Sequence, residues 1–171
     1  MRKASGGFTL IELIVVIVIL GILAVTAAPK FIDLQSDART ATLNGMKAAI
    51  NSAVSLSYGK ALVVAEDKKE NGSIKINGTE QQNILTYGYP KATATAMKAV
   101  MDLDDATFKE CAANVSADWC YVETQGEIKI YIGNMYTVPT NENPGVKCFV
   151  DYKQSTALGK TPEVTVEKTG C

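Results

Sequence analysis

The sequence predicts an α+β fold in which one long N-terminal helix lies across an antiparallel sheet of about four strands. Apolar residues recur at helical spacing through the N-terminal part of the chain and alternate with polar residues near its C-terminal end. The average composition, 47% hydrophobic and 20% charged, is that of an ordinary domain, but its distribution is uneven. Of the 21 residues in the range 8–28, 17 are Ala, Val, Ile, Leu or Phe.

The chain begins with a short basic leader, residues 1–7, that contains Arg2 and Lys3 and ends in two glycines. As a helix, the range 8–28 would extend ~31 Å, which is enough to cross a bilayer core. We therefore expect a transmembrane segment here, with the basic leader on the cytoplasmic side and the rest of the chain exported. A cleaved secretory signal peptide fits less well, because the apolar run is long and no cleavage site follows it.

Glu12 is the only charged residue between Lys3 and Lys30. A carboxylate in hydrocarbon costs at least ~2.5 kcal/mol, so we expect Glu12 to have a partner or to lie near an interface. It can cap the first turn of its own helix, where carboxylates are favoured. Alternatively, a cut between Gly7 and Phe8 would create an α-amino group that neutralises this carboxylate or that of a neighbouring subunit. Both interpretations stay open at this point.

Gly21 and Pro29 weaken the same stretch of helix. Glycine disfavours the helical conformation, and proline removes a backbone hydrogen bond and kinks a continuing helix. The range 21–29 is therefore the part of the helix that bends or unwinds most easily.

The range 29–64 continues the helix in amphipathic form. Its apolar face is made by Leu43, Met46, Ile50, Ala53, Val54, Ser57 and Ala61. A helix over 8–64 would be ~85 Å long, more than one small domain covers. Its first half must be buried by lipid or by other copies of itself; the alternative is a monomer whose helix holds the head away from a membrane.

The range 65–171 is the predicted head, and it begins with a charged break at 66–72. We expect a helix over 92–103, and strands at 73–76, 84–89, 119–124, 127–133, 146–152 and 163–167. The dipeptides Asn77-Gly78 and Gln125-Gly126 predict tight turns.

All four cysteines lie in the head, at Cys111, Cys120, Cys148 and Cys171. An even number in an exported segment favours disulfides, and three pairings are possible. We favour Cys111–Cys120, which closes a local loop, and Cys148–Cys171, which ties the last residue to a strand. Closing that ~24-residue loop contributes about 3 kcal/mol in the chain-entropy model. A zinc site or a catalytic thiol is disfavoured, because histidine and C-x-x-C are absent from the sequence.

No catalytic constellation is evident in the sequence. A calcium site at Asp102, Asp104 and Asp105 is conceivable, but nothing around them resembles a calcium loop, so a solvated helix end is expected. We find no phosphate loop, nucleophile elbow or paired catalytic carboxylates. We therefore predict a protein that is not an enzyme and has neither a metal nor a cofactor.

The string Gly7-Phe8-Thr9-Leu10-Ile11-Glu12 resembles the processing site of type IV prepilins and related pseudopilins. The resemblance implies a type IV pilin-like fold, cleavage after Gly7 by a prepilin peptidase, and N-methylation of Phe8. It also implies that Glu12 pairs with the terminal amine of an adjacent subunit. Pro29 follows Phe8 by 21 residues, as in the family, which suggests that the segment 21–29 unwinds in the filament. The loop closed by Cys148–Cys171 resembles the C-terminal disulfide-bounded loop of these pilins.

The ranges 29–39, 43–49 and 87–90 resemble the major pilin of mannose-sensitive haemagglutinin (MSHA) pili. This implies a structural subunit that polymerises through its N-terminal helix and serves surface attachment and biofilm formation. The implied partners are identical subunits, the prepilin peptidase, an assembly ATPase, a platform protein and minor pilins. The implied location is the inner membrane for the precursor and then an extracellular fimbrium on the cell surface.

Two alternatives come from related assemblies. A major pseudopilin of a type II secretion system is disfavoured by the disulfide-bounded C-terminus. A minor or DNA-uptake pilin would be expected to cluster Lys or Arg with aromatic residues. Removal of Arg2 and Lys3 would leave 15 basic residues against 18 acidic ones, so no nucleic-acid partner is expected.

Overall fold

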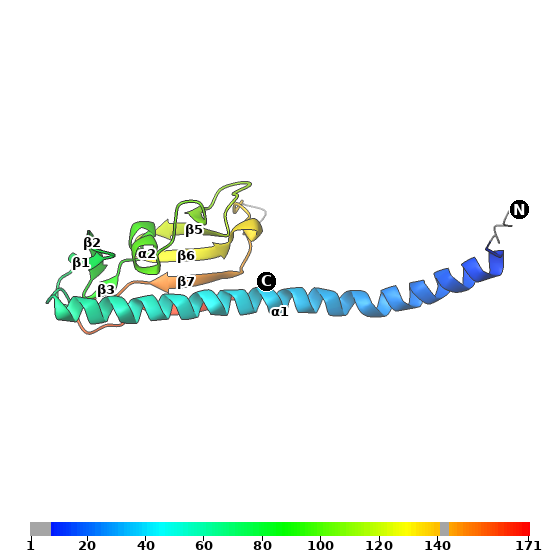
Figure 1. Ribbon diagram of the computed structural model, residues 1–171, viewed down its shortest axis with the longest axis horizontal. Helices are drawn as coiled ribbons and strands as arrows, with labels where there is room; N and C mark the ends of the chain where they lie inside the picture. The colour runs from blue at the N-terminus through cyan, green and yellow to red at the C-terminus, as the bar shows by residue number, and fades with distance from the viewer. Residues whose placement is uncertain (1–7, 141–143) are drawn as a thin grey trace, which may run out of the picture. The chain divides into compact units, whose positions relative to one another are not determined.

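The computed structural model describes residues 8–140 and 144–171, without the side chains of 27–33. The chain divides after Ala38 into two compact units, the second of which is Arg39–Cys171. Helix α1, Leu10–Val63, contributes to both units, and the strands and the other helices belong to the second (Figure 1).

In the first unit the backbone is helical from Leu10 onward, including at Gly21 and Pro29. The segment expected to bend or unwind is therefore helical in the single subunit. Its described side chains, up to Thr26, are all exposed. No helix in the described part of the chain is both long and apolar enough to cross a membrane.

The second unit is built on a five-stranded sheet with strand order β4-β5-β6-β7-β8. β4 pairs with β5 in parallel, and every other neighbouring pair is antiparallel. The strands are β4 (Phe108–Glu110), β5 (Trp119–Thr124), β6 (Glu127–Ile132), β7 (Phe149–Lys153) and β8 (Glu163–Glu167). A 3-10 helix, η1 (Gly133–Met135), follows β6.

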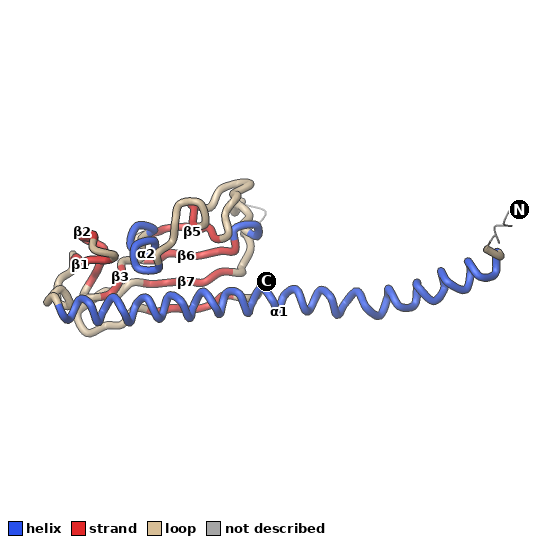
Figure 2. The backbone as a smooth tube through the Cα atoms, in the orientation of Figure 1, coloured by secondary structure: helices blue, strands red, loops and turns tan. Residues whose placement is uncertain are grey.

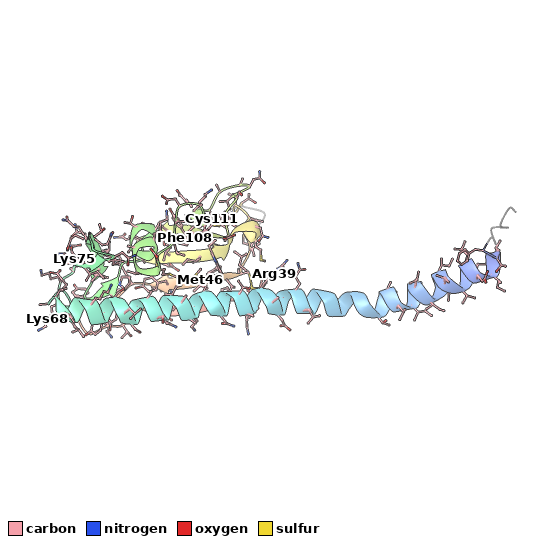
Figure 3. All side chains as sticks on the ribbon, viewed as in Figure 1. Arg39, Met46, Lys68, Lys75, Phe108 and Cys111 are labelled. Atoms are coloured by element: carbon pink, nitrogen blue, oxygen red, sulfur yellow. A yellow bond between two sulfur atoms is a disulfide. The ribbon has the colours of Figure 1, made fainter. Side chains whose placement is uncertain are left out.

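One face of this sheet packs against the second half of α1. Ile128 and Ile130 of β6 lie opposite Tyr152 and Val150 of β7, and all four are fully buried. They share one hydrophobic cluster with the apolar face of α1, namely Leu43, Met46, Ile50 and Val54. Figure 3 labels Met46 on α1 and Phe108, another member of this cluster. Each fully buried aliphatic side chain stabilises the fold by roughly 1.5–3 kcal/mol. The predicted placement of the amphipathic helix across the sheet is confirmed.

A second, smaller sheet has the order β1-β2-β3. Its strands are β1 (Gly72–Ile76), β2 (Thr79–Thr86) and β3 (Tyr89–Pro90). Helix α2 (Ala94–Met101) follows; Thr93 caps it by accepting a hydrogen bond from the Ala96 N–H. Ile74, Ile84 and Leu85 pack with Ala61 and Ala96 in a separate cluster.

The expected fold class is confirmed, but the expected strand count is too low. Within residues 65–140 and 144–171, the head has eight strands in two sheets, instead of one sheet of about four. The prediction of 84–89 as one strand is wrong, because Tyr87 and Gly88 take positive φ values and turn the chain between β2 and β3. β4 was not predicted, because three residues are too few to show a period of two.

Candidate functional site

The N-terminus of α1 is closed by a reciprocal pair of hydrogen bonds between Thr9 and Glu12. The Glu12 carboxylate accepts from the Thr9 N–H at 2.8 Å and from the Thr9 hydroxyl at 2.6 Å. The Thr9 hydroxyl oxygen in turn accepts from the Glu12 N–H at 3.3 Å. This is the geometry of a capping box, which satisfies two of the helix's unpaired donors. In the single subunit, Glu12 therefore caps its own helix.

Phe8 and the helical turns that follow expose an apolar surface on every side. Phe8 is 87% exposed and Ile17 is 56% exposed. The other large apolar side chains exposed in this stretch are Leu10, Ile11, Leu13, Ile14, Val15, Val16, Val18, Ile19, Leu20, Ile22, Leu23 and Val25. A helix that is apolar all round is normally buried, so this segment requires a covering partner.

Glu12 is set among these apolar side chains. A shallow groove of about 320 Å³ is lined by Phe8, Ile11, Glu12, Val15 and Val16. The structure therefore places the expected assembly carboxylate next to the residue that would become the new N-terminus. Gly7 lies outside the described residues, so the position of the scissile bond remains a prediction.

Gly21 and Pro29 are the other two residues expected to serve assembly. A Cβ atom at Gly21 would meet nothing within 4 Å, so the fold of the single subunit does not require glycine there. The side chain of Pro29 lies outside the described part of the structure. Their role in unwinding stays a prediction.

The four cysteines form the two favoured disulfides. Cys111–Cys120 joins the end of β4 to β5, where the Cys111 N–H also donates to the Tyr121 carbonyl at 2.8 Å. Cys148–Cys171 joins the residue before β7 to the residue that follows β8 by four positions. Two of the four cysteines, Cys120 and Cys148, are fully buried.

Arg39 provides a further link at the C-terminal disulfide that sequence reasoning missed. Its Nη1 donates to the Cys171 carbonyl oxygen at 2.8 Å. The Gly170 N–H donates to the Lys147 carbonyl at 2.9 Å beside the same disulfide. The segment after β8 is therefore held both to α1 and to the two residues that precede β7. No periodic signal marks Arg39, because the contact spans 132 positions in the chain.

The acidic cluster after α2 is organised by hydrogen bonds. Asp104 accepts from the Thr107 N–H at 2.7 Å, from the Thr107 hydroxyl at 2.8 Å and from the Ala106 N–H at 2.9 Å. The Thr107 N–H and hydroxyl hold the pKa of Asp104 below its usual value. Asp105 forms an ion pair with Lys98, and Asp102 ends α2 in a left-handed conformation. These contacts are those of a capped helix end. The described residues contain no group of three or more His, Cys, Asp or Glu side chains that could hold a metal ion.

Sequence reasoning also missed a pair of carboxylates, Asp151 and Glu127, on the face of the five-stranded sheet that points away from α1. Asp151 on β7 is only 8% exposed, and its Oδ1 is the one buried side-chain oxygen in the described part of the chain without a hydrogen-bond partner. Burial and the neighbouring Glu127 raise the pKa of Asp151 to about 6. A hydrogen bond from Asp151 lowers the pKa of Glu127. Lys153 and Lys129 lie 3.7 and 3.4 Å from Asp151 and Glu127, respectively.

Comparison with known proteins bears directly on the N-terminal segment. The family described as the prokaryotic N-terminal methylation motif matches residues 2–28. The type IV narrow pilus major component PilA5 of Thermus thermophilus is 49% identical over 125 residues, which cover 73% of this chain and 92% of that protein. The chain belongs to the type IV pilins. This places it among the structural subunits of type IV pili.

Two Moraxella bovis proteins are similar over shorter stretches. The type IV major alpha-pilin is 45% identical over 74 residues, 40% of this chain and 46% of that pilin. Fimbrial protein Q is 38% identical over 93 residues, 49% of this chain and 57% of that protein. No solved structure matches the chain. The type IV pilin similarity is therefore documented by sequence, and the α+β architecture described above is consistent with it.

Proposed function

We propose that this pilin is the subunit of an MSHA-like type IV pilus that mediates surface attachment and biofilm formation, in a structural role without catalysis. The observation that supports it is the exposed apolar stretch that starts at Phe8 and continues along α1, with one carboxylate, Glu12, in the cap of the helix. Self-association would remove this apolar surface from water and stabilise the filament by about 25 cal/mol per Å² buried.

In this proposal the precursor is held at the inner membrane until a prepilin peptidase cuts between Gly7 and Phe8. The methylation motif over residues 2–28 supports N-methylation of the new Phe8 amine. The assembly ATPase, the platform protein and minor pilins then add the subunit to an extracellular fimbrium of identical chains. Helix unwinding between Gly21 and Pro29 would accompany this step.

The proposed role of Glu12 changes between the two stages. In the single subunit its carboxylate accepts hydrogen bonds from Thr9 and so caps α1. In the filament the carboxylate pairs with the terminal amine of the neighbouring subunit. An ion pair is favoured there because an isolated charge among apolar helices would be strongly destabilised.

The experiment that tests this role compares Glu12→Gln with Glu12→Ala. Glutamine preserves the capping box, since Glu and Gln both serve at that position, but it removes the charge. If charge pairing drives assembly, both variants lose surface filaments in electron micrographs while the precursor still accumulates. Normal piliation of Glu12→Gln would show that capping is sufficient and would contradict the pairing.

Attachment is tested separately by a strain that lacks the gene. We expect it to lose filaments and to bind abiotic surfaces poorly, with both properties restored by the unmodified gene. A strain with normal attachment but defective release of secreted enzymes would instead indicate the pseudopilin of a type II secretion system. A strain defective only in DNA uptake would indicate a DNA-uptake pilin.

A further inference from the structure

The last turns of α1 expose an apolar groove that the head leaves open. It has a volume of about 720 Å³ and lies between α1 and β1. Its walls include Leu56, which is 69% exposed, and Val63, which is 86% exposed, and its lining includes the buried Ile74. Single exposed apolar residues are ordinary, but several around one hollow indicate a binding surface.

Charged side chains of both signs surround this groove. Lys60 of α1 is exposed, as is Lys75 of β1, which Figure 3 labels. Glu80 of β2 is exposed opposite Lys75 in the strand pairing. An apolar centre with a charged border is the usual composition of a protein–protein interface. The occupant that fits would present an apolar side chain flanked by charges of both signs.

The loop between β7 and β8 presents such a side chain. Leu158 is 60% exposed. The hydroxyl of Ser155, a residue that is 1% exposed, lies 3.0 Å from the Ala157 carbonyl oxygen and 2.7 Å from that of Lys160. The Lys160 N–H donates to the Ala157 carbonyl at 3.1 Å. These bonds preorganise the loop, so little conformational entropy would be lost when it binds.

The groove and this loop lie on different flanks of α1. The groove contacts α1 through Leu56, Lys60 and Val63. Beside the loop, Thr161 and Pro162 line a second hollow with Val54 and Tyr58, and Ser55 of α1 borders both hollows. At about 100° per residue, the α1 positions that line the two hollows point on average roughly 120° apart. Figure 2 shows the same arrangement, with the loop on the opposite side of α1 from β1 and β2.

We propose that, in the filament, the Leu158 loop of one subunit inserts into the groove at Leu56 and Val63 of another copy. Two different surfaces of one molecule make a heterologous contact, and such contacts extend into open helical filaments when the rotation between copies does not close a ring. The exposed Lys160 and Glu163 that flank the loop complement the acidic and basic side chains at the border of the groove. The inference rests on the proposed polymerisation and adds to it a specific contact between heads.

A cross-linking experiment on intact filaments tests this contact. The double variant Val63→Cys/Leu158→Cys is oxidised in sheared filaments and separated without reductant. We expect a ladder of dimers, trimers and longer multimers, which reductant collapses to monomer. The matched control is Val63→Cys/Thr165→Cys, in which Thr165 is exposed on β8 away from the loop. We expect the control to remain monomeric.

A second measurement keeps the test valid if the double variant assembles poorly. We expect Leu158→Ser to lower the yield of sheared filaments about tenfold and Leu158→Met to restore it, because burial of the apolar side chain is the source of the affinity. Filaments without a ladder, an equal ladder in the control, or a normal yield from Leu158→Ser would each overturn the contact. Absence of filaments from the unmodified chain would overturn the proposed function instead.

Discussion

The two units of this pilin use one helix in opposite ways. In the first unit Ile17 is 56% exposed, whereas in the second Ile50 is completely buried. Both residues lie on α1, and both belong to helical turns with regular hydrogen bonding. The difference lies in the surroundings, because only the second half of the helix has a polar face and a sheet to cover its apolar face. Helix formation therefore does not by itself determine what the helix buries.

The matched substitutions Ile50→Ala and Ile17→Ala test this comparison most strongly. We expect Ile50→Ala to lower the free energy of unfolding of the head by about 2–5 kcal/mol, since it leaves a cavity. Ile17→Ala should leave it unchanged, since the single subunit buries nothing there. Guanidinium unfolding of the full chain in detergent micelles, followed by the fluorescence of Trp119, measures both effects; Trp119 is the only tryptophan and packs against the head's core. Equal losses from the two variants would refute the distinction.

The disulfides sharpen the comparison within the head. Replacing Cys148 and Cys171 by serine should lower the free energy of unfolding by about 3 kcal/mol, because their bond closes a loop with a sequence separation of 23. The Cys111–Cys120 bond spans only 9 positions, so its removal should cost less in the chain-entropy model. The same unfolding assay ranks the two double variants. The reverse order would indicate that loop entropy does not dominate.

The carboxylate pair predicts a pH dependence that belongs to the head alone. The pKa of Asp151 is raised from 3.8 to about 6 by burial and by Glu127, so its contribution to stability is complete below pH 3.8 and is lost as the pH rises through 6. The lowered pKa of Glu127 gives a contribution to stability with the opposite pH dependence, which is lost as the pH falls. Three further titratable side chains face this site, namely Lys129, Lys153 and Tyr131.

We expect Asp151→Asn to abolish the loss of folding stability that accompanies ionisation of Asp151. The variant should stabilise the head by about 1 kcal/mol at neutral pH, after allowance for solvent screening. Unfolding curves between pH 4 and 7 measure the effect. Unchanged pH dependence in the variant would show that Asp151 is not responsible, and Asp105→Asn, at an exposed carboxylate of the head, provides the control.

The smallest expected effect concerns α2. Thr93→Ala removes the side-chain cap on the Ala96 N–H and should cost about 0.5–1 kcal/mol. Thr93→Ser should retain most of the stability, because its hydroxyl can accept the same hydrogen bond. The unfolding midpoint in guanidinium measures both variants. No difference between alanine and serine would mean that the cap contributes little.

Local patterns predicted much of the head. Leu43, Met46 and Ile50 recur at helical spacing, and the alternation around Ile128 and Ile130 marks a strand with one buried face. These predictions succeeded because each pattern reflects one dominant burial direction. The short strand β4 was missed because three residues are too few to show a period of two. The turn at Tyr87 and Gly88 was missed because it is held by a contact outside the local sequence, the hydrogen bond from the Tyr87 N–H to the Lys69 carbonyl.

The sequence by itself determined that the N-terminal helix would be apolar all round with a single carboxylate, since hydropathy and spacing are local properties of the chain. It also determined the amphipathic face of α1, because that face follows from helical periodicity alone. Only the tertiary structure decided that Arg39 holds Cys171, that Asp151 lies buried beside Glu127, and that the Leu158 loop and the groove at Val63 lie on different flanks of α1. These features join residues far apart in the chain, and their positions depend on strand order and register, which no short stretch of sequence encodes.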